Sequence, residues 1–163
     1  MIAAGQPASF EVRRWYDAPP ELVFRAMVDP STVPRWLCPS AEIRLDVLEI
    51  DVRVGGAYRF SYVDKHGRSR SVVRGRYLII EAPQRLAFTW TWEPPDPDAG
   101  VETLVTFDVS ARDGGTEVTV THAHIPGEHK CRAHRAGWTA CLEALEVLVV
   151  NDFNSVDSDT RIP

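Results

Sequence analysis

The sequence has few of the features that mark secreted, membrane or nucleic-acid-binding proteins. Its three cysteines are an odd number at scattered positions, which argues against a disulfide framework and for a reducing cytoplasm. No basic run is present, and 18 Lys and Arg against 23 Asp and Glu leave a formal charge of −5, so we expect no nucleic-acid partner. The longest uncharged stretch is far shorter than the roughly 20 apolar residues of a membrane span. Residues 1–9 contain no Lys or Arg that could open a signal peptide. We therefore expect a cytoplasmic protein without membrane insertion.

What the sequence does contain is enough apolar material for one ordinary domain. The chain has 163 residues, of which 44% are apolar, and it shows no internal repeat. The charge and apolar pattern predicts a flexible N-terminus over residues 1–8, a single domain over 9–150, and a flexible polar tail over 151–163.

The hydrophobic period changes along the chain and predicts an α+β fold. A strand is expected at residues 9–16, followed by two short helices at 21–28 and 32–37. From residue 43 to 124 the period is two, which predicts about six antiparallel strands separated by turns, and residues 128–150 have helical spacing. Because a meander of that length needs one face covered, we expect a strongly curved antiparallel sheet wrapped around the long C-terminal helix. Space for a ligand is common between two such layers.

Several ordered stretches resemble one known family within the START-like superfamily (SRPBCC). That family is named after the C-terminal domain of the activator of heat-shock-protein ATPase. The matching stretches are residues 17–26 (DAPPELVFRA), Asp29-Pro30, Pro34-Arg35-Trp36 with Pro39, residues 51–56 (DVRVGG), residues 75–90, Gly114-Gly115-Thr116, Thr121-His122, and Gly137-Trp138 with Cys141-Leu142. The resemblance covers about residues 10–149 and implies the helix-grip fold, with no cofactor.

The sequence departs from the family pattern at two positions. Leu37 stands where a second Trp is common, and Val54 stands where Pro is usual before Gly-Gly. Leu37 is expected beside the mouth of the cavity that this fold often leaves between sheet and long helix. Function depends on the site and not on the fold, so the shape of the ligand is not copied from relatives.

Aromatic and histidine side chains are the candidates for lining such a cavity. Tyr and Trp combine an apolar ring with a polar atom that a dry core seldom uses, although core filling is the common role of any one of them. His122 or His134 would supply a polar anchor that orients an apolar ligand. The predicted lining is Trp36, Leu37, Phe60, Tyr62, Trp90, His122, His134, Trp138 and Cys141.

Four of the five histidines lie within thirteen residues, beside Cys131. His122 and His124 are expected on one strand face, while Cys131 and His134 are three residues apart on one side of a helix. This arrangement could hold zinc, but its spacing matches no standard zinc pattern, so no metal site is predicted. The alternative is an inward-facing, hydrogen-bonded His122 with His129 and His134 in solvent. A Cys on an apolar helix face is usually inert, so no catalytic residue is assigned.

The predicted function is therefore non-enzymatic binding of a small, largely apolar molecule between the sheet and the terminal helix. One alternative is a partner-binding module resembling the chaperone ATPase-activator domain, and another is a lyase or cyclase that uses His122 with His134 or Tyr62. Arg70, Arg74 and Arg76 share one strand face. That face is expected in solvent, with a partner contact, an anionic ligand group or a homodimer interface left open.

Overall fold

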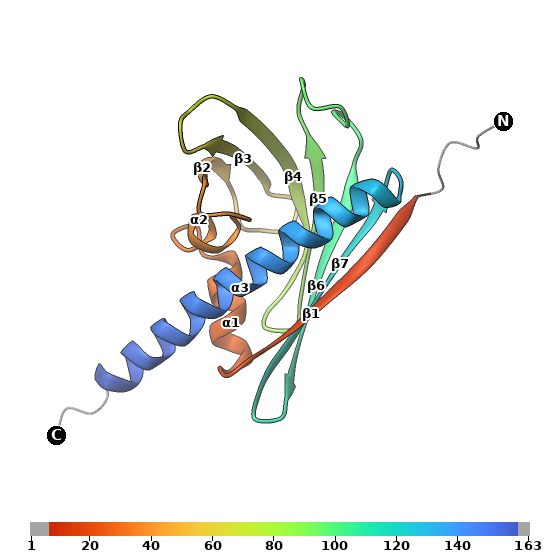
Figure 1. The fold of residues 1–163 in the computed structure, drawn as a ribbon. Helices are drawn as coiled ribbons and strands as arrows, with labels where there is room; N and C mark the ends of the chain where they lie inside the picture. The colour runs from red at the N-terminus through yellow and green to blue at the C-terminus, as the bar shows by residue number, and fades with distance from the viewer. Residues whose placement is uncertain (1–6, 160–163) are drawn as a thin grey trace.

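One antiparallel sheet and three helices make up the described part of the chain. The computed structural model describes residues 7–159, and its sheet has seven strands in the order β1-β7-β6-β5-β4-β3-β2 (Figure 1). The elements are β1 (Ala8–Tyr16), α1 (Pro20–Val28), α2 (Val33–Trp36), β2 (Ile43–Ile50), β3 (Ala57–Asp64), β4 (Arg70–Glu81), β5 (Arg85–Trp92), β6 (Thr103–Arg112), β7 (Gly115–Ile125) and α3 (Glu128–Asp159). The predicted helix-grip architecture, with two short helices after the first strand and a long C-terminal helix, is confirmed.

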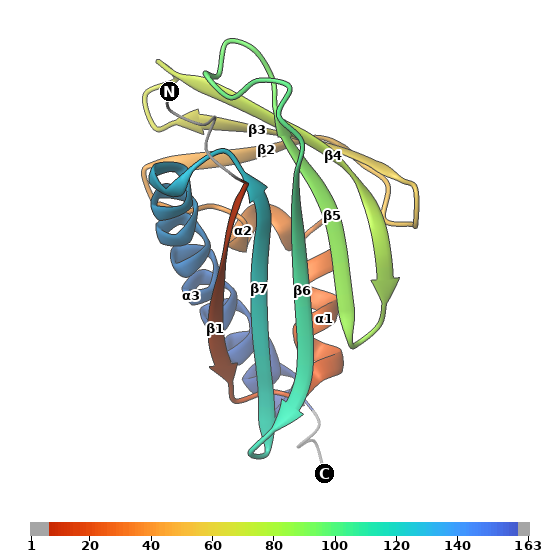
Figure 2. The same ribbon diagram turned by 90° about the vertical axis from the view of Figure 1, so that its right-hand side faces the viewer.

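The sheet is strongly curved, and β-bulges help to bend it. Figure 2 shows β2 and β3 running across the direction of β1, β7 and β6. The strand register shifts between Val47 and Glu49 in β2 and between Tyr77 and Ile79 in β4. Such an extra residue bends its strand and increases the twist. It also explains why Leu48 and Leu78, the residues at the two shifts, are 47% and 46% exposed despite their apolar side chains.

The core lies between the concave face of the sheet and α3. Alternate residues of β5, β6 and β7 point inward, as the period of two predicts, and meet buried leucines of α3. The Tyr16 hydroxyl, fully buried on β1, donates to the Leu142 carbonyl of α3 at 2.8 Å. Helix α2 packs against both α3 and β2, so it covers one end of the layer.

Three sequence-based expectations differ from the structure. His124 has a positive φ of 64°, which breaks the alternation of β7, so His124 is exposed while His122 is fully buried. The two residues therefore do not share a face. The backbone of α3 continues to Asp159 and does not end near Val150. The bounds of three other elements differ by one residue: β1 begins at Ala8, α1 begins at Pro20, and α2 spans Val33–Trp36 where 32–37 was predicted. Residues 1–6 and 160–163, part of the two predicted flexible ends, lie outside the described residues.

No helix within residues 7–159 combines the length and the apolar character needed to cross a bilayer.

Candidate ligand-binding site

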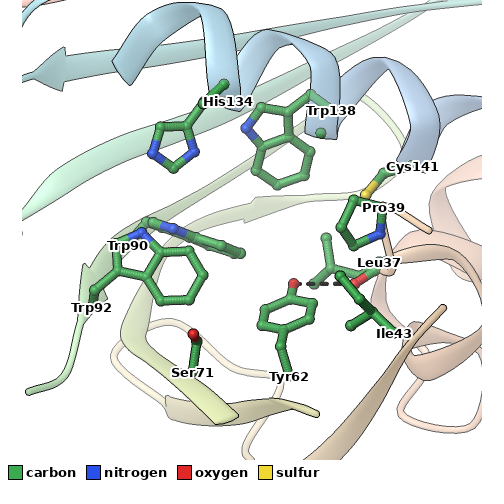
Figure 3. Close-up of a pocket in the computed structure, with 12 residues that line it drawn as sticks. Leu37, Pro39, Ile43, Tyr62, Ser71, Trp90, Trp92, His134, Trp138 and Cys141 are labelled. Atoms are coloured by element: carbon green, nitrogen blue, oxygen red, sulfur yellow. Dashed lines mark hydrogen bonds between the residues drawn. The ribbon is translucent and has the colours of Figure 1, made fainter. Parts of the chain in front are cut away.

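A pocket of about 300 Å³ lies between α3 and the strands β2, β3, β4 and β5. Its walls come from α3 on one side, the sheet on the other, and the segment that follows α2 (Figure 3). This volume is at the lower end of the range for small-molecule sites. The lining residues are Leu37, Pro39, Ile43, Tyr62, Ser71, Trp90, Trp92, Ala133, His134, Gly137, Trp138 and Cys141.

Aromatic rings form most of the inner wall of this pocket. The Trp90 ring centre lies 5.6 Å from that of Trp92 and 5.5 Å from that of Trp138. Tyr62 lies 6.0 Å from Trp92, and its hydroxyl donates to the Leu37 carbonyl at 3.0 Å. Burial raises the pKa of the Tyr62 phenol well above its ordinary value, so this hydroxyl stays protonated. Tyr62 therefore presents its ring and not an ionised oxygen.

A chain of hydrogen bonds behind the wall fixes the protonation of His122. Trp138 Nε1 donates to His122 Nδ1 at 3.0 Å, and an indole nitrogen can only donate. His122 Nδ1 is therefore unprotonated and Nε2 carries the hydrogen, which it donates to Thr103 Oγ1 at 2.7 Å. Thr103 in turn donates to the Trp90 carbonyl at 2.8 Å. Burial is the main reason that the pKa of His122 falls from 6.5 to about 3, with a smaller effect from neighbouring His134.

This chain connects four elements and holds two walls of the pocket in place. It begins at Trp138 on α3, passes through His122 on β7 and Thr103 on β6, and ends at the backbone of Trp90 on β5. His122 does not itself line the pocket. It acts as a positioning residue for the two tryptophans, and neutral imidazole is the one form that fits between these partners.

His134 is the polar side chain that reaches the pocket from α3. Figure 3 shows its ring projecting from the helix toward Trp90 and Trp92. The His134 and His122 ring centres are 4.6 Å apart, and no hydrogen bond joins the His134 ring to the side chains or backbone of residues 7–151. Burial lowers the pKa of His134, and nearby Asp98 partly offsets this while Lys130 adds to it. At pH 7 the ring is therefore mostly neutral.

Six of the nine predicted lining residues meet at this pocket, and three lie elsewhere. The six are Leu37, Tyr62, Trp90, His134, Trp138 and Cys141. Trp36 is 2% exposed and its Nε1 donates to the Ala26 carbonyl, so it belongs to the core. Phe60 stacks on Tyr58 at 4.7 Å, deeper in the same layer. His122 is the third, enclosed by Thr103 and Trp138.

Six other residues complete the lining, and the sequence pattern could have identified some of them. They are Pro39, Ile43, Ser71, Trp92, Ala133 and Gly137. Trp92 continues the alternation of Trp90, and Ala133, Gly137 and Cys141 are small residues spaced by four on one side of a helix. No sequence pattern identified Ile43 and Ser71 as lining residues, because their position at the pocket depends on the curvature of β2 and β4.

The remaining histidines and cysteines do not converge with these residues. Among the described side chains, residues 7–151, no three His, Cys, Asp or Glu are grouped as metal ligands would be. His124 and His129 are exposed, and both His122 ring nitrogens have protein partners. His122, His134 and Tyr62 are the residues considered for acid–base chemistry. Of these three, only His134 lines the pocket without a hydrogen bond from its polar atoms to the described residues. Burial raises the pKa of the Cys141 thiol, so the nucleophilic thiolate is disfavoured.

Replacing Gly137 by Ala is expected to increase the free energy of unfolding by about 0.5–1 kcal/mol, because glycine is the weaker helix former. A Cβ atom at this position would have Pro39 Cβ, at 3.9 Å, as its nearest neighbour outside the helix, which is ordinary contact. Gly137 therefore opens the pocket and is not required for a close approach of α3 to a strand. Urea unfolding of the two proteins measures the difference. A destabilised Gly137→Ala variant would contradict this account.

Comparison with known proteins gives a consistent family and fold. The sequence model of the family described as "Activator of Hsp90 ATPase homolog 1-like protein" matches residues 17–150. No curated protein matches the chain. Among solved structures, protein CV1439 from Chromobacterium violaceum is 27% identical, with a TM-score of 0.77 over 86% of this chain and 96% of that one.

Two further solved structures have the same fold. The AHSA1 protein from Silicibacter pomeroyi is 24% identical, with a TM-score of 0.78 over 89% of this chain and 99% of its own. CalU16 from Micromonospora echinospora is 25% identical, with a TM-score of 0.64 over 97% of this chain and 86% of its own.

Proposed function

This chain belongs to the family of Activator of Hsp90 ATPase homolog 1-like proteins, and we propose that within that family it binds a small, largely apolar molecule without transforming it. The observation that supports this most is the pocket of about 300 Å³ between the sheet and α3. Its walls are mostly aromatic and aliphatic, with Ser71 and His134 as the polar members. Pockets of this kind bind ligands by burying apolar surface, and a few polar groups set the orientation.

The energy available from this pocket sets the expected affinity. Removing about 300 Å² of apolar ligand surface from water would contribute about 7 kcal/mol. Association opposes this through lost translational and rotational freedom. Burial alone would correspond to a dissociation constant of about 10 μM, so the ligand stays bound only if ring contacts and hydrogen bonds offset much of the association cost. His122, Thr103 and Trp138 hold the walls before the ligand arrives, which reduces the cost of ordering them on binding.

Native mass spectrometry of freshly purified protein, followed by the same sample denatured, is expected to show a retained organic mass that disappears on denaturation.

Titration with the neutral fluorophore N-phenyl-1-naphthylamine tests the same site in solution. Three of the five tryptophans line the pocket, so binding should quench tryptophan emission in a saturable way.

A protein with neither a retained mass nor a saturable response to the fluorophore would contradict the proposal. The partner-binding alternative would then be tested by a pull-down with a purified chaperone. A retained mass that the protein converts into a second compound would instead support the enzymatic alternative.

A further inference from the structure

We propose that the preferred ligand is a neutral, flat bicyclic aromatic molecule whose hydroxyl group hydrogen-bonds to His134; this rests on the proposed function. Three properties of the pocket carry the inference: the angles between its rings, the absence of charge on its lining, and two side chains whose nitrogen atoms have no hydrogen-bond partner in the described part of the chain.

The first property concerns the aromatic walls. Trp90 meets Trp92 at 89° and Trp138 at 60°, and Tyr62 meets Trp90 at 48° and Trp92 at 52°. None of these pairs is stacked face to face, and all four rings line the pocket. A flat aromatic ligand can pack against such surfaces in offset or edge-to-face geometry, which adds attraction beyond the area buried. An alkyl chain of equal area gains only the burial.

The second property is the lack of charge on the lining. None of the twelve lining residues is Arg, Lys, Asp or Glu, and His134 is mostly neutral at pH 7. Lys130 and Asp98, two of the charged groups that act on His134, pair with each other at 3.0 Å. An ionised ligand such as a carboxylate would lose its hydration without gaining a partner of opposite charge. A phenol remains neutral at this pH and avoids that penalty.

The third property is that two side chains of the lining, His134 and Trp90, have nitrogen atoms without a hydrogen-bond partner within the described structure. Neutral imidazole offers one donor and one acceptor, and both ring nitrogens of His134 are without a hydrogen bond to residues 7–151. Trp90 is 5% exposed, and its Nε1–H also has no partner among the described residues. A buried N–H such as that of Trp90 normally finds a partner, while His134 is half-buried. A hydroxyl can donate to His134 on α3, and its oxygen keeps lone pairs with which to accept from an N–H group of the lining.

The test is a calorimetric titration of the full chain at pH 7.4 with four probes of similar size: 2-naphthol, naphthalene, 2-naphthoate and 1-decanol. We expect 2-naphthol to bind about fivefold more tightly than naphthalene because of one additional hydrogen bond. We expect 1-decanol to bind several-fold more weakly than 2-naphthol, because it lacks the ring contacts. We expect 2-naphthoate to bind at least about tenfold more weakly than 2-naphthol, because its charge is desolvated.

The variant His134→Leu separates the hydroxyl contact from general packing. It is expected to abolish the preference for 2-naphthol over naphthalene while naphthalene still binds. Because the preference is a ratio measured within one protein, a change in stability cancels from it. The matched control is His129→Leu, which changes an exposed histidine on the first turn of the same helix and should keep the ratio.

The outcomes distinguish this inference from the function on which it rests. If 1-decanol binds as tightly as 2-naphthol, or if His134→Leu retains the preference, the aromatic-alcohol proposal is wrong while apolar binding stands. If none of the four probes produces a saturable heat, both the ligand class and the proposed binding function fail.

Discussion

Lowering the pH from 7 to 5 is expected to reduce the free energy of unfolding by about 2 kcal/mol through His122 alone. His122 has no solvent-exposed surface, and its pKa in the folded chain is about 3 against an ordinary value of 6.5. Between those two values the unfolded chain binds a proton that the folded chain does not bind. The contribution of His122 is therefore fully present above pH 6.5 and is lost as the pH falls toward 3.

The window between pH 7 and 5 isolates the histidines from the carboxylates. Asp46 and Asp64 have pKa values lowered from 3.8 by their hydrogen bonds, so they stay ionised throughout this window. His134, whose pKa is also lowered, adds a smaller contribution of the same sign. An acid-induced loss of stability that begins near pH 6.5 is thus attributable to buried imidazole, while a loss that begins only below pH 5 would come from the acidic residues.

The measurement is chemical unfolding of the wild type and of His122→Leu at pH 7, 6 and 5. The variant is expected to be less stable at pH 7 by about 1–3 kcal/mol, because the Trp138 indole N–H is left without its acceptor. Its stability should also change little with pH. His129→Leu, which alters an exposed histidine, should retain the wild-type dependence. A wild type that is equally stable at pH 7 and 5 would show that His122 is not held neutral by its surroundings.

The order of elements was predictable because each one has a simple periodic cause. The alternation of Leu86, Phe88, Trp90 and Trp92 places all four on one face, and the structure puts that face inward. The helical spacing of Trp138, Cys141, Leu142 and Leu145 likewise places those side chains against the sheet. Both patterns report on the local backbone geometry, which neighbouring residues determine.

The lining of the pocket was harder to predict. The alternation of residues along a strand shows which face a side chain points to, but not whether it lies in the core or at the pocket. Phe60 and Tyr62 share the inner face of β3, yet Phe60 stacks on Tyr58 in the core while Tyr62 reaches the pocket. Which of them meets open space depends on how far the sheet curves, and therefore on contacts between residues remote in sequence. His122 shows the same limit, since it faces inward as expected but Trp138 and Thr103 cover it.

His124 illustrates a different cause of error. The pattern of β7 predicted that His122 and His124 would share a face. His124 instead has a left-handed backbone conformation, which reverses the inward and outward alternation of the residues that follow it. After His124 it is Ile125 that is buried. The sequence marks this position only weakly, since histidine adopts a positive φ more often than most residues but far less readily than glycine.

Replacing Gly137 by Leu is expected to weaken binding of N-phenyl-1-naphthylamine at least about tenfold, because the added side chain occupies space that the ligand needs. Gly137 lines the pocket of about 300 Å³, and a side chain built from it would extend past Pro39 into that volume. Leucine is a far better helix former than glycine, so the helix itself should gain stability. The variant thereby removes the cavity without removing the fold, and thermal unfolding recorded on the same samples verifies this.

The matched control is Ala136→Leu, which adds the same group to the neighbouring, exposed position of α3 and should leave the affinity unchanged. Gly137→Ala should fall between the two, with most of the pocket still open. This series links the bound fluorophore to one location, since the three variants share a helix and differ in how much of the cavity they fill. If Gly137→Leu folds and binds as tightly as the wild type, the fluorophore occupies another surface. The space between α3 and the sheet is then not the binding site of this protein.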